Sequence, residues 1–339
     1  MIGVCNGKPV SITGLGCYAP ERVLGNDELS ELVDTSDEWI QTRTGIRERR
    51  IAAPEQATSD LCVPAAEAAL RDAGVQAAEL DLVIVTTITA DMLFPSTAAL
   101  VAARLGASGA AAYDLSAGCT GFVYGLVQGY AAISAGLAKR VLVIGADTLS
   151  RIVDWSDRAT CVLFGDGAGA VVLERVEAGG FHVFELGADG AGGMELFMPA
   201  GGSRRTASAE TVAAREHYVK MNGREVYKFA TRVLPSSAQA ALEASGRSVA
   251  DIDLYVPHQA NLRIIEHAAK KLGIDKERVF VNVDRYGNTS SASIPLALCE
   301  ARAEGRLEDG TLVLMTGMGA GLTWGSSVIT WTEGRNDEQ

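Results

Sequence analysis

The sequence contains little histidine and no closely spaced pair of cysteines. Its 339 residues include four histidines and six scattered cysteines, without any C-x-x-C pair. Zinc sites need clusters of such ligands, so this pattern disfavours a metal site. It also disfavours a disulfide framework and is typical of a protein from the reduced cytoplasm.

Long apolar runs and an excess of basic residues are also missing. No apolar stretch approaches the length of a membrane span, and the first residues, MIGVCNGKPVSITG, lack the features of a signal peptide. The formal net charge is −12, whereas binding to nucleic-acid phosphates requires a basic surface. We therefore expect a cytoplasmic protein that binds neither membranes nor nucleic acids.

Short β-branched runs alternate with longer helical runs along the chain. Strands are predicted at residues 10–15, 82–87, 111–115, 141–145, 168–173, 181–186, 254–256, 279–283, 312–316 and 323–331. Helices are predicted at residues 59–73, 96–105, 120–136, 223–245, 261–272 and 290–304. This alternation indicates an α/β protein with parallel or mixed sheets covered by helices on both faces.

Two similar segments suggest that the chain is an old duplication. GDGAGAVVLE (165–174) resembles GMGAGLTWGSSVIT (317–330), so we predict one half at residues 1–178 and a second at residues 179–339. The segment 187–217 is rich in Gly, Ala and Ser and is expected to be a long surface connection. The tail EGRNDEQ is expected to be disordered.

Two of the predicted helices carry stripes of small residues at a spacing of four. The stripes are Gly121, Gly125 and Gly129 in one helix, and Thr289, Ser293, Ala297 and Ala301 in the other. Residues four apart share a helix face, and glycine inside a helix costs about 1 kcal/mol relative to alanine. The stripes therefore predict close packing against a rigid neighbour, or of the two helices against each other.

Cys119 is a candidate nucleophile in the segment AYDLSAGCTGFVYGL (112–126). It stands where a strand ends and a helix begins, and a helix N-terminus lowers the pKa of a thiol. Gly118 and Gly121 leave room for a substrate, and the backbone N–H of the cysteine is free to face an oxyanion. The alternative is a buried cysteine that only fills space.

His258 and Asn288 stand at similar strand ends, in YVPHQANLRIIE (255–266) and DRYGNTSSASIPLAL (284–298). Each alone is compatible with a turn or a helix cap. Because the carboxyl ends of inner strands meet at one edge of a sheet, one cleft shared with Cys119 is plausible. A Cys, a His and an Asn in this order also occur in papain-like proteases, so the set leaves the reaction open.

The local sequences narrow the choice. DLSAGCTGF, VPHQANLRII, GNTSSASIPLAL and GMGAGLTWGS closely resemble the active-site segments of the β-ketoacyl-acyl carrier protein synthase III family, which initiates bacterial fatty-acid synthesis. DTSDEWIQTRTGIRERRI, DRATCVLFGDGAGAVV and MNGREVYKF extend the likeness over almost the whole chain. The resemblance implies a homodimer with the thiolase-like fold, in which duplicated βαβαβαββ halves form five αβαβα layers.

The resemblance also implies roles for individual residues. Cys119 would take an acyl group from acyl-coenzyme A, which is a substrate, so that no cofactor is needed. His258 Nε2 and the Asn288 amide would donate hydrogen bonds to the thioester oxygen of malonyl-acyl carrier protein as it loses carbon dioxide. The N–H groups of Cys119 and Ala320 would bind the acyl oxygen. Met318 stands where the family often has phenylalanine, and the chemistry is expected to survive this difference.

The substrates would contact further residues that match the family. For coenzyme A and the acyl group, the resemblance implies Trp39 and Arg158 around the adenine, Arg43 at a phosphate, Asn261 at the pantetheine, and Phe94. Acidic acyl carrier protein would dock on basic residues at the cleft mouth, namely Arg263, Lys228, Lys270 and Lys271. Three alternatives remain: a natural-product starter synthase or acyltransferase with the same fold, a cysteine hydrolase, and an inactive scaffold homologue.

Overall fold

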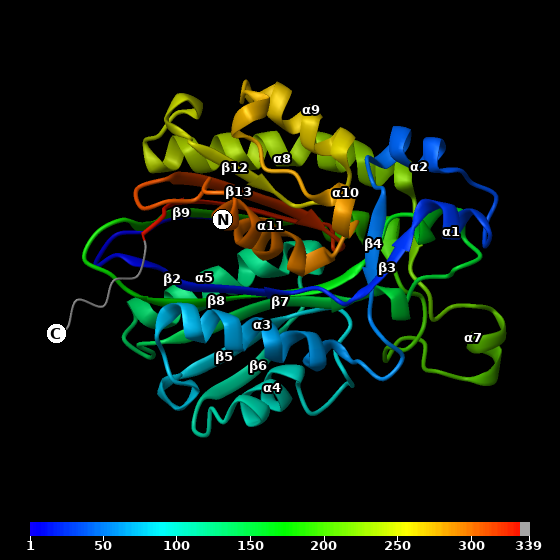
Figure 1. The fold of residues 1–339 in the computed structure, drawn as a ribbon, viewed down its shortest axis with the longest axis horizontal. Coiled ribbons are helices and arrows are strands. Elements are labelled where there is room, and N and C mark those ends of the chain that lie inside the picture. Colours follow the sequence, from blue (N-terminus) through cyan, green and yellow to red (C-terminus); the bar gives the residue numbers. More distant parts are fainter. Residues whose placement is uncertain (333–339) are drawn as a thin grey trace.

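The computed structural model describes residues 1–332, which form five layers (Figure 1). Two five-stranded sheets lie face to face, with helices between them and on both outer sides. This is the thiolase-like αβαβα arrangement predicted above. The predicted disorder of the tail EGRNDEQ concerns residues 333–339, which lie outside the described residues.

The first sheet has the strand order β2-β8-β7-β5-β6. β5 runs parallel to β6 and β7, whereas β8 runs antiparallel to β2 and β7. Strands such as LVIVT and VLVIGADT are buried along their whole length, because helices cover both faces of the sheet. The bounds are β2 (Val10–Tyr18), β5 (Leu82–Thr86), β6 (Ala111–Leu115), β7 (Val141–Thr148) and β8 (Asp166–Arg175).

The second sheet has the order β1-β9-β14-β13-β12. Four of its strands repeat the order of the first sheet, since β9, β14, β13 and β12 follow one another as β2, β8, β7 and β5 do, with β12 parallel to β13. The bounds are β1 (Ile2–Val4), β9 (Gly180–Ala188), β12 (Leu254–Pro257), β13 (Leu312–Gly319) and β14 (Thr323–Thr330). The boundary between halves at residues 178 and 179 stays a prediction; β1, from the first half, pairs with β9 in the second sheet.

The strand predicted at residues 279–283 is wrong. This segment occupies the place of β6 but forms only an isolated bridge between Val279 and Tyr255. The Gln259 side chain takes up its backbone groups: Gln259 Nε2 donates to Phe280 O (3.1 Å), and Oε1 accepts from the Asn282 N–H (3.0 Å). The chain then turns into the short helix α10 (Val283–Tyr286).

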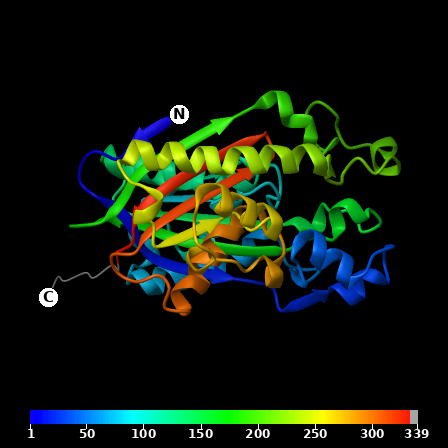
Figure 2. The ribbon, with the colours of Figure 1, turned by 90° about the horizontal axis from the view of Figure 1, so that it is seen from above.

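Outer helices cover the far faces of both sheets. α3 (Thr58–Ala73) and α4 (Thr97–Leu105) lie outside the first sheet, and α8 (Gly223–Ser245) and α9 (Leu262–Leu272) lie over the second, as Figures 1 and 2 show. The smaller elements are β3 (Arg22–Gly25), α1 (Asn26–Ser30), α2 (Asp37–Thr44), β4 (Glu48–Ile51), α6 (Arg158–Cys161), β10 (Leu196–Phe197), α7 (Ala209–Ala213) and β11 (Lys220–Met221).

The central layer contains α5 (Gly121–Ser134) and α11 (Ser293–Ala303), each preceded by a 3-10 turn. A Cβ at Gly125 would lie 2.7 Å from Thr86 Cγ2, and one at Gly129 would lie 2.6 Å from Leu173 Cδ1. The glycine stripe of α5 therefore packs mainly against the first sheet and not against the stripe of α11. Only at Gly121 does it approach the other half, where a Cβ would lie 2.8 Å from Ser291 Oγ.

The segment predicted as a surface connection at residues 187–217 is only partly that. It contains β10 and α7, and β10 pairs with β11. Leu196, Phe197 and Met198 from this segment line a cavity beside Cys119, as described below. Over residues 1–332, the structure contains no helix long and apolar enough to cross a membrane.

Candidate active site

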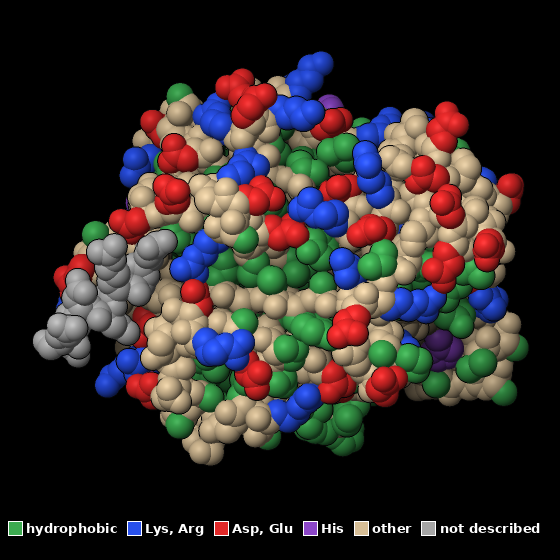
Figure 3. Space-filling model, viewed as in Figure 1, with side chains coloured by type: hydrophobic (Ala, Val, Ile, Leu, Met, Phe, Trp, Pro, Cys, Tyr) green, Lys and Arg blue, Asp and Glu red, His purple; other side chains and the backbone are tan. Residues whose placement is uncertain are grey.

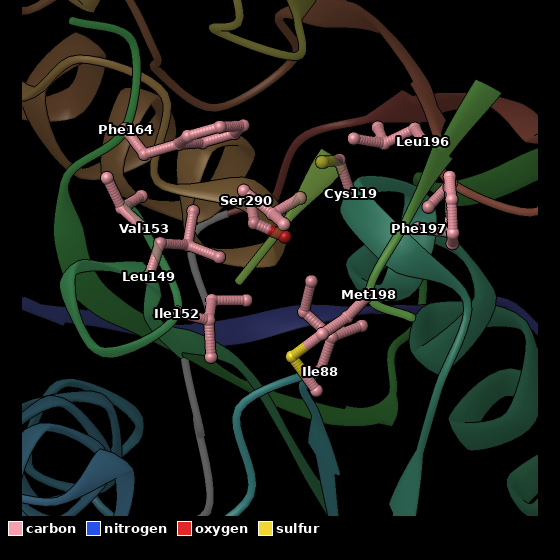
Figure 4. A pocket seen from close by; sticks show the side chains of 12 residues that line it. Ile88, Cys119, Leu149, Ile152, Val153, Phe164, Leu196, Phe197, Met198 and Ser290 are labelled. Atoms are coloured by element: carbon pink, nitrogen blue, oxygen red, sulfur yellow. The ribbon is translucent and has the colours of Figure 1, made fainter. Parts of the chain in front are cut away.

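Two cavities border Cys119 in the described part of the chain. The larger, about 180 Å³, is walled almost entirely by apolar side chains: Ile88, Leu149, Ile152, Val153, Phe164, Leu196, Phe197, Met198 and Val219 (Figure 4). The smaller, about 90 Å³, contains His258 and Asn288 and extends towards Tyr227 and Asn261. The thiol therefore stands between an apolar space and a space with polar hydrogen-bonding groups.

Cys119 sits in the 3-10 turn η2 (Gly118–Thr120), between the end of β6 and the start of α5. Gly118 has φ of +56°, a region that favours glycine, and a Cβ there would lie 2.7 Å from Ala320 N. A Cβ on Gly319 would overlap the backbone nitrogen of Cys119. Both glycines are therefore needed to bring the 319–320 backbone against the cysteine, beside the larger cavity that Ala320 helps to line.

The prediction that the helix N-terminus lowers the Cys119 pKa is wrong for this structure. Burial raises the pKa of the thiol to about 12, and the Asp147 carboxylate adds to the increase. The Ser290 hydroxyl, which has no hydrogen bond of normal geometry, and the cysteine's own N–H offset only part of this. Removal from water outweighs the local dipole, so the resting side chain is a neutral thiol at pH 7.

Asp147 is a buried carboxylate that the sequence analysis did not single out. Its Oδ1 accepts hydrogen bonds from Thr87 Oγ1 (2.9 Å), Ile88 N (2.8 Å) and Thr89 Oγ1 (2.8 Å). These bonds hold the 87–89 segment, and Ile88 forms part of the apolar wall. An acidic residue inside the buried strand VLVIGADT was the available signal, because a buried charge requires such partners.

His258 lies just after β12 and is almost fully buried. Its backbone N–H donates to Thr316 O (2.7 Å), and its Nδ1 lies 2.6 Å from Ser293 Oγ. Among the described residues, no group hydrogen-bonds to Nε2. Burial lowers the histidine pKa to about 3, so the ring is neutral at physiological pH.

Asn288 lines the same cavity as His258. The Asn288 backbone N–H donates to Leu163 O (2.8 Å), and its carbonyl accepts from the Gly165 N–H (3.0 Å). The side-chain Oδ1 accepts from Ser290 N (2.9 Å). The oxygen is thus occupied, which leaves the NH₂ end of the amide as the donor available to a ligand.

The remaining residues predicted near the acyl group separate into two sets. Met318 is buried and lines the His258 cavity, and Ala320 lines the larger cavity. Phe94 lies outside both cavities and is 84% exposed, next to the exposed Leu93. A contact between Phe94 and substrate stays a prediction.

The four residues predicted to bind coenzyme A contact one another in two pairs: Arg158 contacts Trp39, and Asn261 contacts Arg43. The Arg158 guanidinium lies 5.0 Å from the centroid of the Trp39 ring. Asn261 caps α9, because its Oδ1 accepts from Arg263 N (2.9 Å), and its Nδ2 donates to Arg43 O (3.1 Å). Asn261 is therefore a helix cap, and this role is compatible with its place on the wall of the smaller cavity.

Of the predicted basic residues, Lys228 and Arg263 lie on α8 and α9 beside residues that line this cavity, whereas Lys270 and Lys271 lie at the other end of α9. Lys228 pairs with Glu225 (2.7 Å), which neutralises part of its charge. Arg263 stacks over the Tyr227 ring at 5.7 Å. Lys270 and Lys271 lie in the last turn of α9. Figure 3 shows basic and acidic side chains interspersed on the visible face.

Comparisons with known proteins agree with this geometry. The family model for 3-oxoacyl-[acyl-carrier-protein (ACP)] synthase III matches residues 113–190, and that for its C-terminal part matches residues 242–331. The β-ketoacyl-[acyl-carrier-protein] synthase III of Symbiobacterium thermophilum is 58% identical to this chain, over 96% of the chain and 98% of the relative.

Solved structures give the same result. The enzyme of that name from Thermus thermophilus has a TM-score of 0.88 and 53% identity, with 95% of this chain and 99% of the other covered. A priming β-ketosynthase from the R1128 polyketide pathway has a TM-score of 0.90 but 36% identity, with 98% and 100% covered. This chain belongs to the β-ketoacyl-[acyl-carrier-protein] synthase III family.

Proposed function

We propose that this chain joins a short-chain acyl group from acyl-coenzyme A to malonyl-acyl carrier protein, with loss of carbon dioxide, and thereby initiates fatty-acid synthesis. The observation that carries the proposal is the position of Cys119. It borders both an apolar cavity and one that contains two neutral hydrogen-bonding side chains. An acyl chain fits the first, and a polar thioester fits the second.

In the first half-reaction, Cys119 Sγ attacks the carbonyl carbon of the acyl thioester, and the coenzyme A sulfur leaves with the thiol proton. Thiolates are strong nucleophiles, and the new thioester remains activated for the next step. The acyl chain occupies the apolar cavity of about 180 Å³. The N–H groups of Cys119 and Ala320 bind the oxyanion, because charge on that oxygen exists only in the transition state.

In the second half-reaction, the malonyl group loses carbon dioxide and the electron pair of the broken bond moves towards the thioester oxygen. His258 Nε2 and the Asn288 amide stabilise that charge as hydrogen-bond donors. The resulting carbanion attacks the acyl carbon held on Cys119, and the sulfur leaves. The product is a 3-oxoacyl-acyl carrier protein, two carbons longer than the acyl group.

The alternatives make different demands on the same site. A cysteine hydrolase needs water at the acyl-enzyme, whereas the cavity beside Cys119 is apolar. A natural-product starter synthase would use the same chemistry. This chain is 58% and 55% identical to two relatives named β-ketoacyl-[acyl-carrier-protein] synthase III, but only 36% identical to the polyketide priming enzyme. The higher identity favours a role in fatty-acid synthesis.

We also propose a homodimer. The loop around Met92, Leu93 and Phe94 exposes 49%, 89% and 84% of these side chains. Three consecutive apolar side chains in water are unfavourable, and such exposed groups commonly mark a protein interface.

Coenzyme A would lie beside Trp39 and Arg158, whose planar groups suit a purine.

The function is tested by incubating the enzyme with acetyl- and branched-chain acyl-coenzyme A and malonyl-acyl carrier protein. Mass analysis should detect 3-oxoacyl-acyl carrier protein, and the same panel identifies the preferred acyl group. Free fatty acid as the main product would instead support the hydrolase. Absence of any acyl-enzyme would support the scaffold alternative.

The two half-reactions should differ in their dependence on pH. Since burial raises the pKa of Cys119 to about 12, the thiolate fraction grows about tenfold for each pH unit below that value. Acylation should therefore accelerate from about pH 6 to about pH 9 without a plateau. Burial lowers the pKa of His258 to about 3, so the histidine is neutral over this whole range and decarboxylation should be nearly flat.

Rapid-mixing measurements of each half-reaction test this expectation. A plateau in acylation at pH 6 to 7 would contradict a raised thiol pKa. An acidic limb in the decarboxylation profile near pH 6 would mean that His258 becomes protonated there.

Reversing the charge of Arg263 should weaken docking of the acidic carrier protein. Arg263 is exposed on α9, beside the smaller cavity, and long-range attraction acts mainly on encounter and orientation. We expect Arg263→Glu to raise the KM for malonyl-acyl carrier protein several-fold, with less difference at high salt. Acylation by acyl-coenzyme A should stay near the unmodified rate.

Lys139→Glu is the matched control, because Lys139 is exposed just beyond the end of α5 that is remote from Cys119. Steady-state kinetics with each substrate should leave this control unchanged. Equal losses with both substrates for Arg263→Glu would indicate damage to α9. No loss with either substrate would locate carrier-protein docking elsewhere.

A further inference from the structure

The direction in which His258 donates its hydrogen depends on Ser293. A neutral imidazole carries hydrogen on only one of its two nitrogens. Nδ1 lies 2.6 Å from Ser293 Oγ, whereas Nε2 is buried and, over residues 1–332, has no protein partner. Only the form with hydrogen on Nε2 can donate into the cavity that Cys119 and Asn288 also line.

The hydrogen bond of Ser293 distinguishes the two tautomers of the neutral His258 ring. Ser293 is buried, and within residues 1–332 its hydroxyl makes a hydrogen bond only with His258 Nδ1. If Nδ1–H donated to Oγ, the hydroxyl proton would be left buried without an acceptor, which is unfavourable. If Oγ–H donates to Nδ1, one hydrogen bond satisfies both groups and the imidazole hydrogen lies on Nε2.

The same turn also aligns the nucleophile. Ser293 is the first residue of α11 and directly follows the 3-10 turn η7 (Ser290–Ala292). In that turn, Ser291 Oγ donates to Gly118 O (3.2 Å), next to Cys119. The start of α11 thus contacts both the cysteine turn and the histidine ring, so their relative position depends on one rigid element.

We infer that Ser293 is a positioning residue, whose hydroxyl donates to His258 Nδ1 and keeps the imidazole hydrogen on Nε2. A hydroxyl does this without bringing a charge, and a neutral donor is what the decarboxylation step requires. The consequence for catalysis rests on the proposed function, whereas the location of the hydrogen does not. In the sequence, Ser293 stands out only as a member of the small-residue stripe, whereas Asn288 alone in GNTSSASIPLAL is predicted to contact substrate.

The direct test is nitrogen NMR of the enzyme labelled with ¹⁵N-histidine. The chain has four histidines, so His258→Ala assigns the relevant pair of ring signals. We expect a protonated Nε2 and a bare Nδ1 in the unmodified enzyme. The opposite pattern would overturn the inference without requiring any Ser293 variant to fold.

Kinetics of Ser293 variants give the second test. Ser293→Ala should slow decarboxylation of malonyl-acyl carrier protein on the order of 10- to 100-fold, as loss of a partner that orients histidine commonly does, and should shift the ring signals towards Nδ1–H. Acylation of Cys119 should change less than about twofold. Ser293→Thr, which keeps the hydroxyl, should restore both the rate and the signals.

Ser327→Ala is the matched control, since Ser327 is another buried serine that donates to a backbone carbonyl, Val183 O (3.1 Å), in the second sheet. It should leave both half-reactions unchanged. Normal decarboxylation by Ser293→Ala would overturn the positioning role. An unmodified enzyme with the Nε2–H form but no decarboxylation would overturn the proposed function and leave the hydrogen assignment intact.

Discussion

Replacing Cys119 with alanine should abolish acyl transfer, with a loss on the order of 10⁴-fold or more, because nothing else in the site can form the thioester. Peptide mapping after incubation with a short-chain acyl-coenzyme A should locate the label on Cys119 alone. The cavity geometry requires this, since Cys119 borders both cavities and the other cysteines border neither.

Cys161→Ala and Cys299→Ala are the matched controls for this result. Burial raises the pKa of the Cys161 thiol to about 11, so this cysteine is comparably unreactive, and it lines neither cavity. Both controls should acylate normally. Label on Cys161 or Cys299, together with condensation by Cys119→Ala, would contradict the assignment of the nucleophile.

The second large effect is a separation of the two half-reactions. His258→Ala and Asn288→Ala should still accept an acyl group on Cys119 but should decarboxylate malonyl-acyl carrier protein about 100- to 1000-fold more slowly. Removal of one preorganised oxyanion donor has an effect of this size. Single-turnover acylation and carbon dioxide release, measured separately, give the two rates.

His267→Ala controls for the loss of a histidine, since His267 is exposed on α9. It should behave as the unmodified enzyme does in both assays. If the His258 and Asn288 variants decarboxylate normally, the donor role is wrong. If they lose acylation first, activation of the thiol is the better account.

Much of the fold follows from local sequence, because the inner strands are buried on both faces and read as continuous apolar runs. The predicted strand at residues 279–283 has the same composition yet fails to form. Its backbone groups are bound by Gln259, about twenty residues earlier in the chain. A strand prediction based on propensity has no access to that competition.

The site shows the same division between local and distant effects. The motifs around Cys119, His258 and Asn288 identify three residues that the structure brings to the walls of one cavity. The direction of the Cys119 pKa was predicted wrongly, because a helix N-terminus is a local feature whereas burial depends on the whole fold. Ser293 contacts a histidine 35 positions away, so the sequence indicated its place in the small-residue stripe but not its contact with His258.

The most direct test of the account follows a single acyl group. Enzyme acylated on Cys119 with an isotope-labelled acyl group, and freed of excess acyl-coenzyme A, is mixed with malonyl-acyl carrier protein, and the products are separated by mass. The account predicts that the label moves to 3-oxoacyl-acyl carrier protein, with one carbon dioxide released for each acyl group transferred. Label recovered mainly as free acid, or retained on Cys119 while carbon dioxide is released, would contradict it.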